Sequence, residues 1–498
     1  MKKRIIALCM AAALMATTMA ACQGESSSPS STSGGENSTP ESSTQKESVN
    51  ITMSHCQGEW SWPSLENVMK QYTETSGNTV ELLYVPSEEY NTWITSQFAG
   101  GTEPDVIWSA GQPAGDFYKN QWIIDLKPYL EAESPYTGAP WQDSFSGNIL
   151  NGVIDPNGTG AMVGVPMSIS MVNLYYNKDL CEELGLDVSQ PLSWSQVLDY
   201  CKIIQEKNPD LVPMSVMNST SWNLGWQTNF MMEHLWYDVV DIVDVVDENG
   251  RIDTPEAAAA VKAGVIKLDD QRMVDFYNYM RELSKYFNNG FNTASWEYES
   301  LFNEGKAVFN LNGSWFPSQV LQNELDINYG TLPIPYVDSG ITDKTDNRLH
   351  KYSLGLGGPD LMVTQKGMDE GRGEAGVDLL QFLTDPGTGA KVLCDEMMSI
   401  PVVDGVDVPE QLKGITDYIG DDEQKVNFGA SVQAMTAEAN DQYNVMFANF
   451  LDDDSITAEE LAANVQALYL EACEEAIASH EEWDIDAAIE KINSNLNS

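Results

Sequence analysis

The chain has 498 residues, and its 75 acidic residues outnumber its 26 Lys and Arg residues, which gives a formal net charge of −49. A charge of this size excludes nucleic acid as a partner, because phosphates would be repelled, and it disfavours adsorption on anionic lipid. The length is sufficient for two or more packed domains.

Residues 1–21 predict a signal peptide. The basic run Met1-Lys2-Lys3-Arg4 precedes an apolar stretch, 5–16, that is shorter than the roughly 20 residues a membrane span requires. The segment ends in small residues before Cys22 and resembles a bacterial lipoprotein signal, which implies lipidation of Cys22 and attachment to the membrane. Residues 22–48, rich in Ser, Thr, Gly, Pro and Glu, predict a disordered tether.

Residues 49–108 predict parallel strands of an α/β domain. Apolar and polar residues alternate from Val49 to Met53, a helix follows with its apolar face at 65–72, and 79–85 form the next strand. A strand, a helix and a strand within about 35 residues indicate a parallel βαβ unit. After a second helix, Pro104 blocks helical continuation, and Val106-Ile107 predict a buried strand.

Residues 160–204 predict a short strand at 162–166, an uncharged run to Leu174 and a helix that ends at Gly185. Ser193 and Gln196 then predict a capping box at the start of the next helix. A later helix is expected with Thr254 as N-cap and Pro255 at N1. A C-terminal helical section begins at a Thr457–Glu460 capping box and extends to about residue 494.

The seven cysteines lie far apart, and none forms a C-x-x-C pair. With Cys9 and Cys22 in the N-terminal segment, five remain, and they predict buried free thiols rather than a disulfide framework or a zinc site. The four histidines form no metal motif. Neither a metal ion nor a cofactor is therefore expected.

Five segments, in order, resemble bacterial extracellular solute-binding proteins of the carbohydrate branch, the receptors of ABC sugar importers. They are the helix with A-G and P-D-V at 93–108, N-Q-W-I-I-D-L-K-P-Y at 120–129, the run from G-V-P through L-Y-Y-N-K-D-L to P-L-S-W at 164–194, F-N-E-G-K-A-V-F-N-L-N-G-S-W at 302–315, and I-P-V at 400–402. In the second segment, Gln121 stands where the family usually has Gly.

The resemblance implies a periplasmic-binding-protein-like type II fold of class α/β. Its two α/β lobes are joined by a hinge that the chain crosses several times, and the ligand cleft lies between them. The expected boundaries are 49–168 plus 356–400 for lobe 1, and 169–355 plus 401–498 for lobe 2. A ligand would stabilise the closed state by binding it more tightly than the open one.

A sugar ring has apolar C–H faces and a rim of hydroxyls, so it requires aromatic platforms beside short-range donors and acceptors. Loops at strand ends supply such residues, where open α/β sheets bind ligands. The resemblance places a stacking tryptophan at Trp315. The candidate ligand-binding residues are Gln57, Glu59, Trp60, Trp62, Trp108, Ser109, Gln112, Ser170, Trp222, Trp226, Asn312 and Trp315. Trp122, Trp141, Trp194 and Trp236 predict core residues, and Asp105 is expected to orient its own loop.

The resulting expectation is a monomeric lipoprotein on the extracellular face of the cell membrane. It would capture a mono- or oligosaccharide and deliver it to ABC permease subunits, without catalysis. Two alternatives remain.

The same fold could bind a peptide, a polyamine or an organic anion, although an anion would require Arg or Lys in the cleft loops, which contain none. A surface glycoside hydrolase is the other, but carboxylate pairs arise by chance in so acidic a chain, and no G-x-S-x-G or H-E-x-x-H motif occurs.

Overall fold

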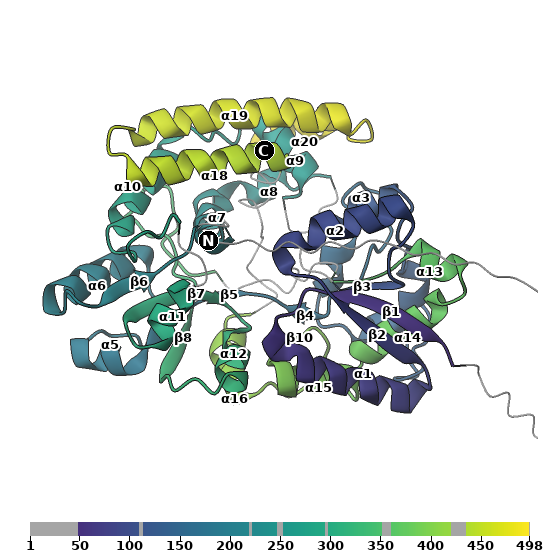
Figure 1. The fold of residues 1–498 in the computed structure, drawn as a ribbon. Helices are drawn as coiled ribbons and strands as arrows, with labels where there is room; N and C mark the ends of the chain where they lie inside the picture. The colour runs from purple at the N-terminus through teal and green to yellow at the C-terminus, as the bar shows by residue number, and fades with distance from the viewer. Residues whose placement is uncertain are drawn as a thin grey trace, which may run out of the picture. The chain divides into compact units, whose positions relative to one another are not determined.

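A computed structural model of the chain describes residues 48–108, 113–218, 222–246, 252–293, 297–350, 360–419 and 435–497. The side chains of Glu88, Trp222, Asn223, Trp226 and Glu297 are outside this description. The predicted signal peptide, Cys22 and residues 22–47 of the tether also lie outside the described residues. The fold class predicted from the sequence, α/β, is confirmed by two four-stranded sheets with helices around them (Figure 1).

The first sheet has the strand order β2-β1-β3-β9. Its strands are β1 (Asn50–His55), β2 (Thr79–Tyr84), β3 (Val106–Trp108) and β9 (Leu361–Val363). β1 is parallel to β2 and β3, whereas β9 is antiparallel to β3. The parallel β1–β2 pair with a helix between its strands confirms the predicted βαβ unit.

Helices cover both faces of this sheet. α1 (Trp62–Ser76) packs its apolar side against Ile51 and Met53, and it ends at Gly77 with a φ of 78°. α2 (Ser87–Gly100) packs against Ile107 and Met362 in a separate apolar cluster. Because neighbouring residues of a strand point to opposite faces, the two helices lie on opposite sides of the sheet.

Short helices and turns fill residues 113–165: α3 (Ala114–Lys119), α4 (Lys127–Leu130), and the 3₁₀ turns η2 (Trp141–Ser144) and η3 (Ile149–Val153). The strand expected at 162–166 is wrong in extent. Only isolated bridges form there, Ile154 with Met162 and Val165 with Leu361. Pairing cannot continue through Pro166, which has no N–H group to donate.

The second sheet has the order β6-β7-β5-β8. Its strands are β5 (Val172–Asn177), β6 (Val212–Ser215), β7 (Ala307–Gly313) and β8 (Tyr329–Pro333). β5 is antiparallel to both β7 and β8, and β6 is parallel to β7. After β5, α5 (Lys178–Leu184) ends at Gly185 with a φ of 67°, and the predicted Ser193–Gln196 capping box opens α6 (Trp194–Lys207).

The helices beyond this sheet include one corrected boundary. α9 begins with Asp253 as N-cap and not with Thr254, and Asp253 forms a capping box with Glu256. Glu256 also accepts hydrogen bonds from the backbone N–H groups of Val245 and Val246, at 2.6 and 2.7 Å, so the preceding loop fixes where the helix starts. The helices are α7 (Trp222–Trp236), η4 (Tyr237–Val239), α8 (Val240–Val243), α9 (Thr254–Ala263), α10 (Gln271–Ser284), α11 (Glu297–Asn303) and α12 (Phe316–Gln322).

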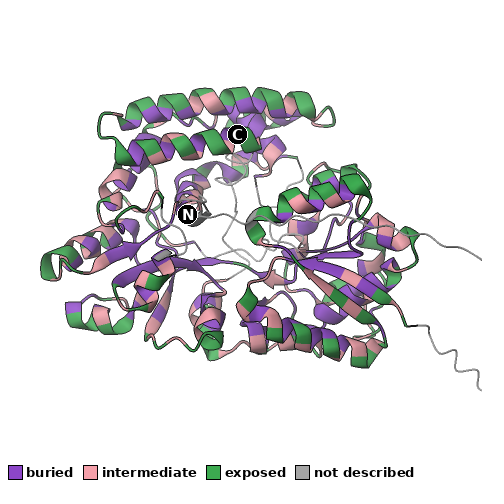
Figure 2. Ribbon diagram, in the orientation of Figure 1, coloured by how far each residue is buried: buried purple, intermediate pink, exposed green. Residues whose placement is uncertain are grey.

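The last part of the chain is helical. It contains α13 (Gln365–Asp369), α14 (Gly373–Leu383), α15 (Gly389–Met397), α16 (Glu410–Thr416), α18 (Ala437–Asp452), α19 (Ala458–Ser479) and α20 (Ile485–Leu496). The predicted Thr457–Glu460 capping box opens α19, and the predicted C-terminal helical section consists of α19 and α20, which a turn between His480 and Asp484 separates. α18 and α19 pack side by side, and the buried residues form a stripe along each (Figures 1 and 2).

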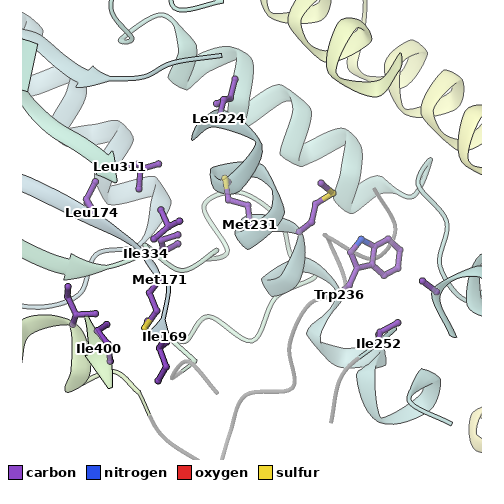
Figure 3. Packing of buried hydrophobic residues seen from close by; sticks show 14 of the residues in the cluster. Ile169, Met171, Leu174, Leu224, Met231, Trp236, Ile252, Leu311, Ile334 and Ile400 are labelled. Atoms are coloured by element: carbon purple, nitrogen blue, oxygen red, sulfur yellow. The ribbon is translucent and has the colours of Figure 1, made fainter. Parts of the chain in front are cut away.

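A third, very short pairing joins β4 (Ser168–Ile169) to β10 (Ile400–Pro401). The strands are antiparallel, with Ile169 opposite Ile400 and Ser168 opposite Pro401. Figure 3 shows Ile169 and Ile400 in the buried apolar cluster, near Met171 at the start of the second sheet. Segments that are far apart in the sequence, at Ile169 and at Ile400, therefore meet between the two large sheets (Figure 1).

None of the described cysteines, Cys56, Cys181, Cys201, Cys394 and Cys473, forms a disulfide, as predicted, and all but Cys56 are buried. Trp141, Trp194 and Trp236 are buried core residues, also as predicted, while Trp122 is partly buried against the α2 cluster. Among the described residues, no helix has both the length and the apolarity needed to cross a membrane.

Candidate functional site

A pocket opens where the β4–β10 pairing meets the ends of β1, β3 and β7. Its wall comes from six parts of the chain: the loop after β1, the end of β3, the segment around β4, the turn after β7, the residue before β9, and the segment that leads into β10. The lining residues are Gln57, Trp60, Trp108, Met167, Ser168, Ile169, Ser170, Ser314, Trp315, Asp360, Met397, Met398, Ser399 and Ile400.

The loop after β1 presents Gln57 and Trp60. Local hydrogen bonds give this loop its shape, because the N–H and the hydroxyl of Ser61 both donate to the carbonyl of Gly58, at 2.9 and 2.7 Å. The indole Nε1 of Trp62 donates to the carbonyl of Gln57 at 3.1 Å. These bonds form the 3₁₀ turn η1 (Glu59–Ser61) and hold Trp60 at the pocket.

The N-G-S-W sequence after β7 presents Ser314 and Trp315. Asn312 is buried, donates from Nδ2 to Glu299 at 2.9 Å, and accepts from the N–H of Gly313 at 2.8 Å. The N–H of Ser314 donates to the carbonyl of Met171 at 2.7 Å. Asn312 therefore shapes the turn from beneath, and Ser314 ties the turn to the chain beyond β4.

Both partly exposed pocket tryptophans follow a glycine by two residues. A methyl group added at Gly58 would overlap the indole of Trp60, and one added at Gly313 would overlap the six-membered ring of Trp315. Each indole thus lies directly against a glycine Cα, in a space that any larger residue would fill. The repeated G-x-W spacing is therefore a packing requirement that sets where each ring lies.

Asp360, which directly precedes β9, supplies the acidic group of the pocket. Its Oδ2 accepts a hydrogen bond from the backbone N–H of Met167 at 3.0 Å. Burial raises the pKa of this carboxyl to about 7, although hydrogen bonds from the backbone N–H groups of Met167 and Ser168 act in the opposite direction. Met398, which also lines the pocket, has a φ of 51°, a left-handed conformation that is uncommon for a residue with a side chain.

The chemistry of the wall is mostly apolar. Three indoles, three thioethers and two isoleucines face a few neutral polar groups and one carboxyl, that of Asp360. No Lys or Arg is present among the described lining residues. In the part of the chain that the structure describes, no group of three or more His, Cys, Asp or Glu side chains could hold a metal ion. Such a wall matches a ligand with apolar faces and neutral donors.

Of the residues predicted from the sequence, five line this pocket: Gln57, Trp60, Trp108, Ser170 and Trp315. Trp108 is only 1% exposed, so it forms the floor of the pocket rather than a free stacking surface. Three others do not line it. Trp62 packs edge-on against Tyr84 with 4.9 Å between ring centroids, Glu59 is exposed outside the pocket, and Asn312 lies beneath the turn. Ser109, Gln112 and the side chains of Trp222 and Trp226 lie outside the described residues.

Sequence reasoning missed Asp360, the methionines and the residues next to β10. Met167 belongs to a run that the sequence marked only as uncharged, and Met397 and Met398 lie at the end of a helix far along the chain. Asp360 had one usable signal, an acidic residue directly before the apolar strand Leu361–Val363. Strand-end carboxylates are common ligand-binding groups, but nothing local shows that this strand adjoins β3.

Comparisons with known proteins identify the family of the chain. The family described as "Bacterial extracellular solute-binding protein" matches residues 62–390. A putative binding protein of Brucella abortus is 22% identical over 287 residues, which are 56% of this chain and 61% of that protein. The chain thus matches about three fifths of the length of that curated relative.

Solved structures of similar fold are also known. The GacH receptor of Streptomyces glaucescens, solved unliganded and with acarbose, has a TM-score of 0.61 at 17% identity, over 86% of this chain and all of that one. A maltose-bound T. maritima protein has a TM-score of 0.59 at 22% identity, over 85% of this chain and 99% of that one. At such identities the likeness shows the fold, which is the periplasmic-binding-protein-like type II fold expected from the sequence.

The fold and the pocket therefore define the class of protein, which is a solute-binding protein. This chain belongs to the bacterial extracellular solute-binding protein family. The family resemblance inferred from the five sequence segments is confirmed.

Proposed function

We propose that this protein is the carbohydrate receptor of an ABC importer, with an oligosaccharide as its ligand, and that the pocket lined by Trp60, Trp108 and Trp315 is where the sugar binds. The observation that carries the proposal is the wall itself: indole and thioether surfaces beside neutral polar groups, with no cation among the described lining residues. Aromatic faces pack on the C–H faces of sugars, and serine hydroxyls and Gln57 can pair with ring hydroxyls.

The fold supports this proposal. Relatives of similar fold were solved with acarbose and with maltose, which are both carbohydrates. An organic anion is a poorer fit, because a desolvated anion requires a cation or several donors in its site. A polyamine would require more than one acidic group, and the described wall offers Asp360 alone.

The division into two lobes, 49–168 plus 356–400 and 169–355 plus 401–498, belongs to the same proposal. The pairing of β4 with β10 supports a hinge at this place, because both strands lie between the two large sheets (Figure 1) and both contribute to the pocket wall. Closure around the sugar would then follow from its higher affinity for the closed state, without any catalytic step.

Lipidation of Cys22 would hold the protein on the extracellular face of the cell membrane, with residues 22–48 as a tether and the receptor as a monomer. The remaining partners are ABC permease subunits, which would accept the sugar. The support is the Cys22 signal in the sequence and the membership of an extracellular receptor family.

The test is a ligand panel of neutral oligosaccharides, amino acids, a dipeptide, spermidine and citrate, screened by thermal shift and then measured by calorimetry. A bound ligand raises the apparent melting temperature by mass action. Binding of a neutral sugar in the micromolar range, about 8 kcal/mol, with the sugar recovered intact, is the expected result. Preference for citrate, spermidine or the peptide would reject the carbohydrate assignment, and cleavage of the sugar would reject the receptor assignment.

A further inference from the structure

Asp360 differs from every other described residue that lines the pocket, because it alone can carry a charge. Its carboxyl lies beside the segment that contains β4, and the backbone N–H of Met167 donates to Oδ2 at 3.0 Å. The surrounding wall is made largely of Met, Ile and Trp side chains. The backbone N–H of Ser168 also forms a hydrogen bond with this carboxyl.

The carboxyl has two opposing influences. Backbone N–H groups stabilise the ionised form, whereas burial in an apolar wall stabilises the neutral form, and burial is the larger effect. The pKa is consequently raised to about 7, so that both forms are populated near neutral pH. A ligand that contacts this carboxyl would change the balance between them.

We propose that Asp360 is a ligand-binding residue that makes sugar affinity depend on pH, because sugar hydroxyls donate hydrogen bonds to its carboxylate and so favour loss of its proton. This inference rests on the proposed carbohydrate function and names the group that would determine how tightly the site binds. The sugar itself is unchanged, and the proton passes from the Asp360 carboxyl to solvent.

Among the described residues of the surrounding elements, no other acidic, basic or histidine side chain lines the pocket. His55, at the end of β1, is buried and its pKa is lowered to about 4 by burial, so it is neutral in the range considered. Glu59 of η1 is exposed outside the pocket. Glu396 of α15 accepts a hydrogen bond from Asn67 at 2.5 Å, and Asp105 before β3 is bonded to Arg372. The described segments 167–170 and 397–400 contain no ionisable side chain.

The direction of the effect follows from linkage. If the sugar prefers the ionised carboxylate, its affinity increases as the pH rises toward the pKa of Asp360 in the sugar-free protein. Above that pKa, the affinity is constant. Below pH 7, the dissociation constant should rise by up to about tenfold for each pH unit, and binding should release up to one proton. A carboxyl that served only to hold Met167 in place would release no proton when a sugar binds.

The experiment uses the full chain and calorimetry with maltose, raffinose and chitobiose between pH 5.5 and 8.5. Each titration is repeated in phosphate and in Tris buffer, whose different ionisation enthalpies reveal the number of protons exchanged. This count requires no variant, so it does not depend on the folding of a mutant. Asp360→Asn should bind more weakly and lose the pH dependence, while Asp395→Asn, which changes a carboxylate outside the pocket, should keep both the affinity and the pH profile.

The possible outcomes separate the two proposals. Proton release with a wild-type pH profile that Asp360→Asn abolishes supports the inference. Sugar binding without proton exchange, or with the same pH profile in Asp360→Asn, overturns the inference and leaves the carbohydrate function intact. If none of the sugars binds at any pH, the carbohydrate function is contradicted and the inference with it.

Discussion

Arg372 donates a hydrogen bond from Nε to the carboxylate of Asp105 at 2.8 Å, and thereby joins the start of α14 to the start of β3. The other carboxylate oxygen accepts from both the N–H and the hydroxyl of Thr52 on β1, each at 2.9 Å. Asp105 is 1% exposed, so it orients its own loop and the sheet instead of a ligand, as the sequence predicted.

Replacement of Asp105 by Ala should therefore lower the free energy of unfolding by roughly 3 kcal/mol, because a buried, hydrogen-bonded charge pair is broken and Thr52 loses its acceptor. Burial alone would raise the pKa of Asp105, but the bonds from Arg372 and Thr52 outweigh burial and lower it. The contribution of the Asp105 carboxylate to the free energy of unfolding is thus complete above the pKa of about 4 that an Asp has in the unfolded chain. It is lost as the pH falls below that value. Urea unfolding at pH 7 and pH 3 measures this, with Asp116→Asn on the exposed side of α3 as control; an unchanged stability at pH 7 would contradict the assignment.

Alanine at Gly58 or Gly313 should reduce sugar affinity by roughly tenfold, because the added methyl group overlaps the indole of Trp60 or Trp315 and moves the ring. Neither glycine has a positive φ, so the backbone tolerates alanine. Gly100→Ala, whose methyl group would lie 3.4 Å from its nearest neighbour, Thr102 Oγ1, is the control. Calorimetry measures the affinity, and equal binding by Gly100→Ala and Gly313→Ala would show that ring position does not matter.

Removal of the Trp315 side chain should weaken sugar binding by roughly 1–3 kcal/mol with little change in the free energy of unfolding, because the indole is only partly buried at the pocket. Trp93→Ala on α2 removes a partly exposed indole away from the pocket and is the matched control. The assignment of Trp315 would fail if both variants bound the sugar as the wild type does.

The unfolding free energy should fall as the pH drops from about 6.5 to 4, in part through His55. This histidine is 3% exposed, its Nδ1 has no hydrogen-bond partner among the described residues, and burial lowers its pKa to about 4. The unfolded chain binds a proton at higher pH than the folded chain, so the loss is up to about 1.4 kcal/mol per pH unit for this one group. His55→Phe should show a smaller difference in stability between pH 7.5 and pH 5; an identical difference would mean that His55 does not titrate on unfolding.

Glycine at position 121 should stabilise the protein by up to about 1 kcal/mol. Gln121 has a φ of 59°, a left-handed conformation in which a side chain is strained. The greater freedom of glycine in the unfolded chain offsets part of this gain. Gln121→Ala is the control, because it removes the same side chain but keeps the Cβ atom that strains the backbone at this φ. Equal melting temperatures for Gln121→Gly and Gln121→Ala would show that backbone strain does not lower the stability.

The sequence predicted those features that depend on neighbouring residues. The capping boxes at Ser193 and Thr457 and the parallel β1–β2 pair are local patterns, and the structure has them. Trp60 and Trp315 could be proposed because each lies in a recognisable loop after a strand. The spacing of Gly58 to Trp60 and of Gly313 to Trp315 was also visible, but its meaning depends on where the rings lie.

The features that the sequence did not predict depend on contacts between distant segments. Asp360 reaches the pocket because β9 pairs with β3 at the edge of the first sheet, and no local pattern encodes that pairing. The helix start at Asp253 was missed because Thr254 is an equally good local N-cap, and the contacts of Glu256 with Val245 and Val246 decide between them. The strand expected at 162–166 was wrong for a similar reason, since its only partners are single residues.

The pairing of β4 with β10 has a mechanical consequence. Only two residue pairs join these strands, whereas six join β1 to β2. One member of the short pairing is Pro401, which cannot donate a ladder hydrogen bond. A two-stranded pairing with so few residue pairs offers little resistance to bending or twisting. Thermal motion can therefore bend it while the four-stranded sheets keep their shape.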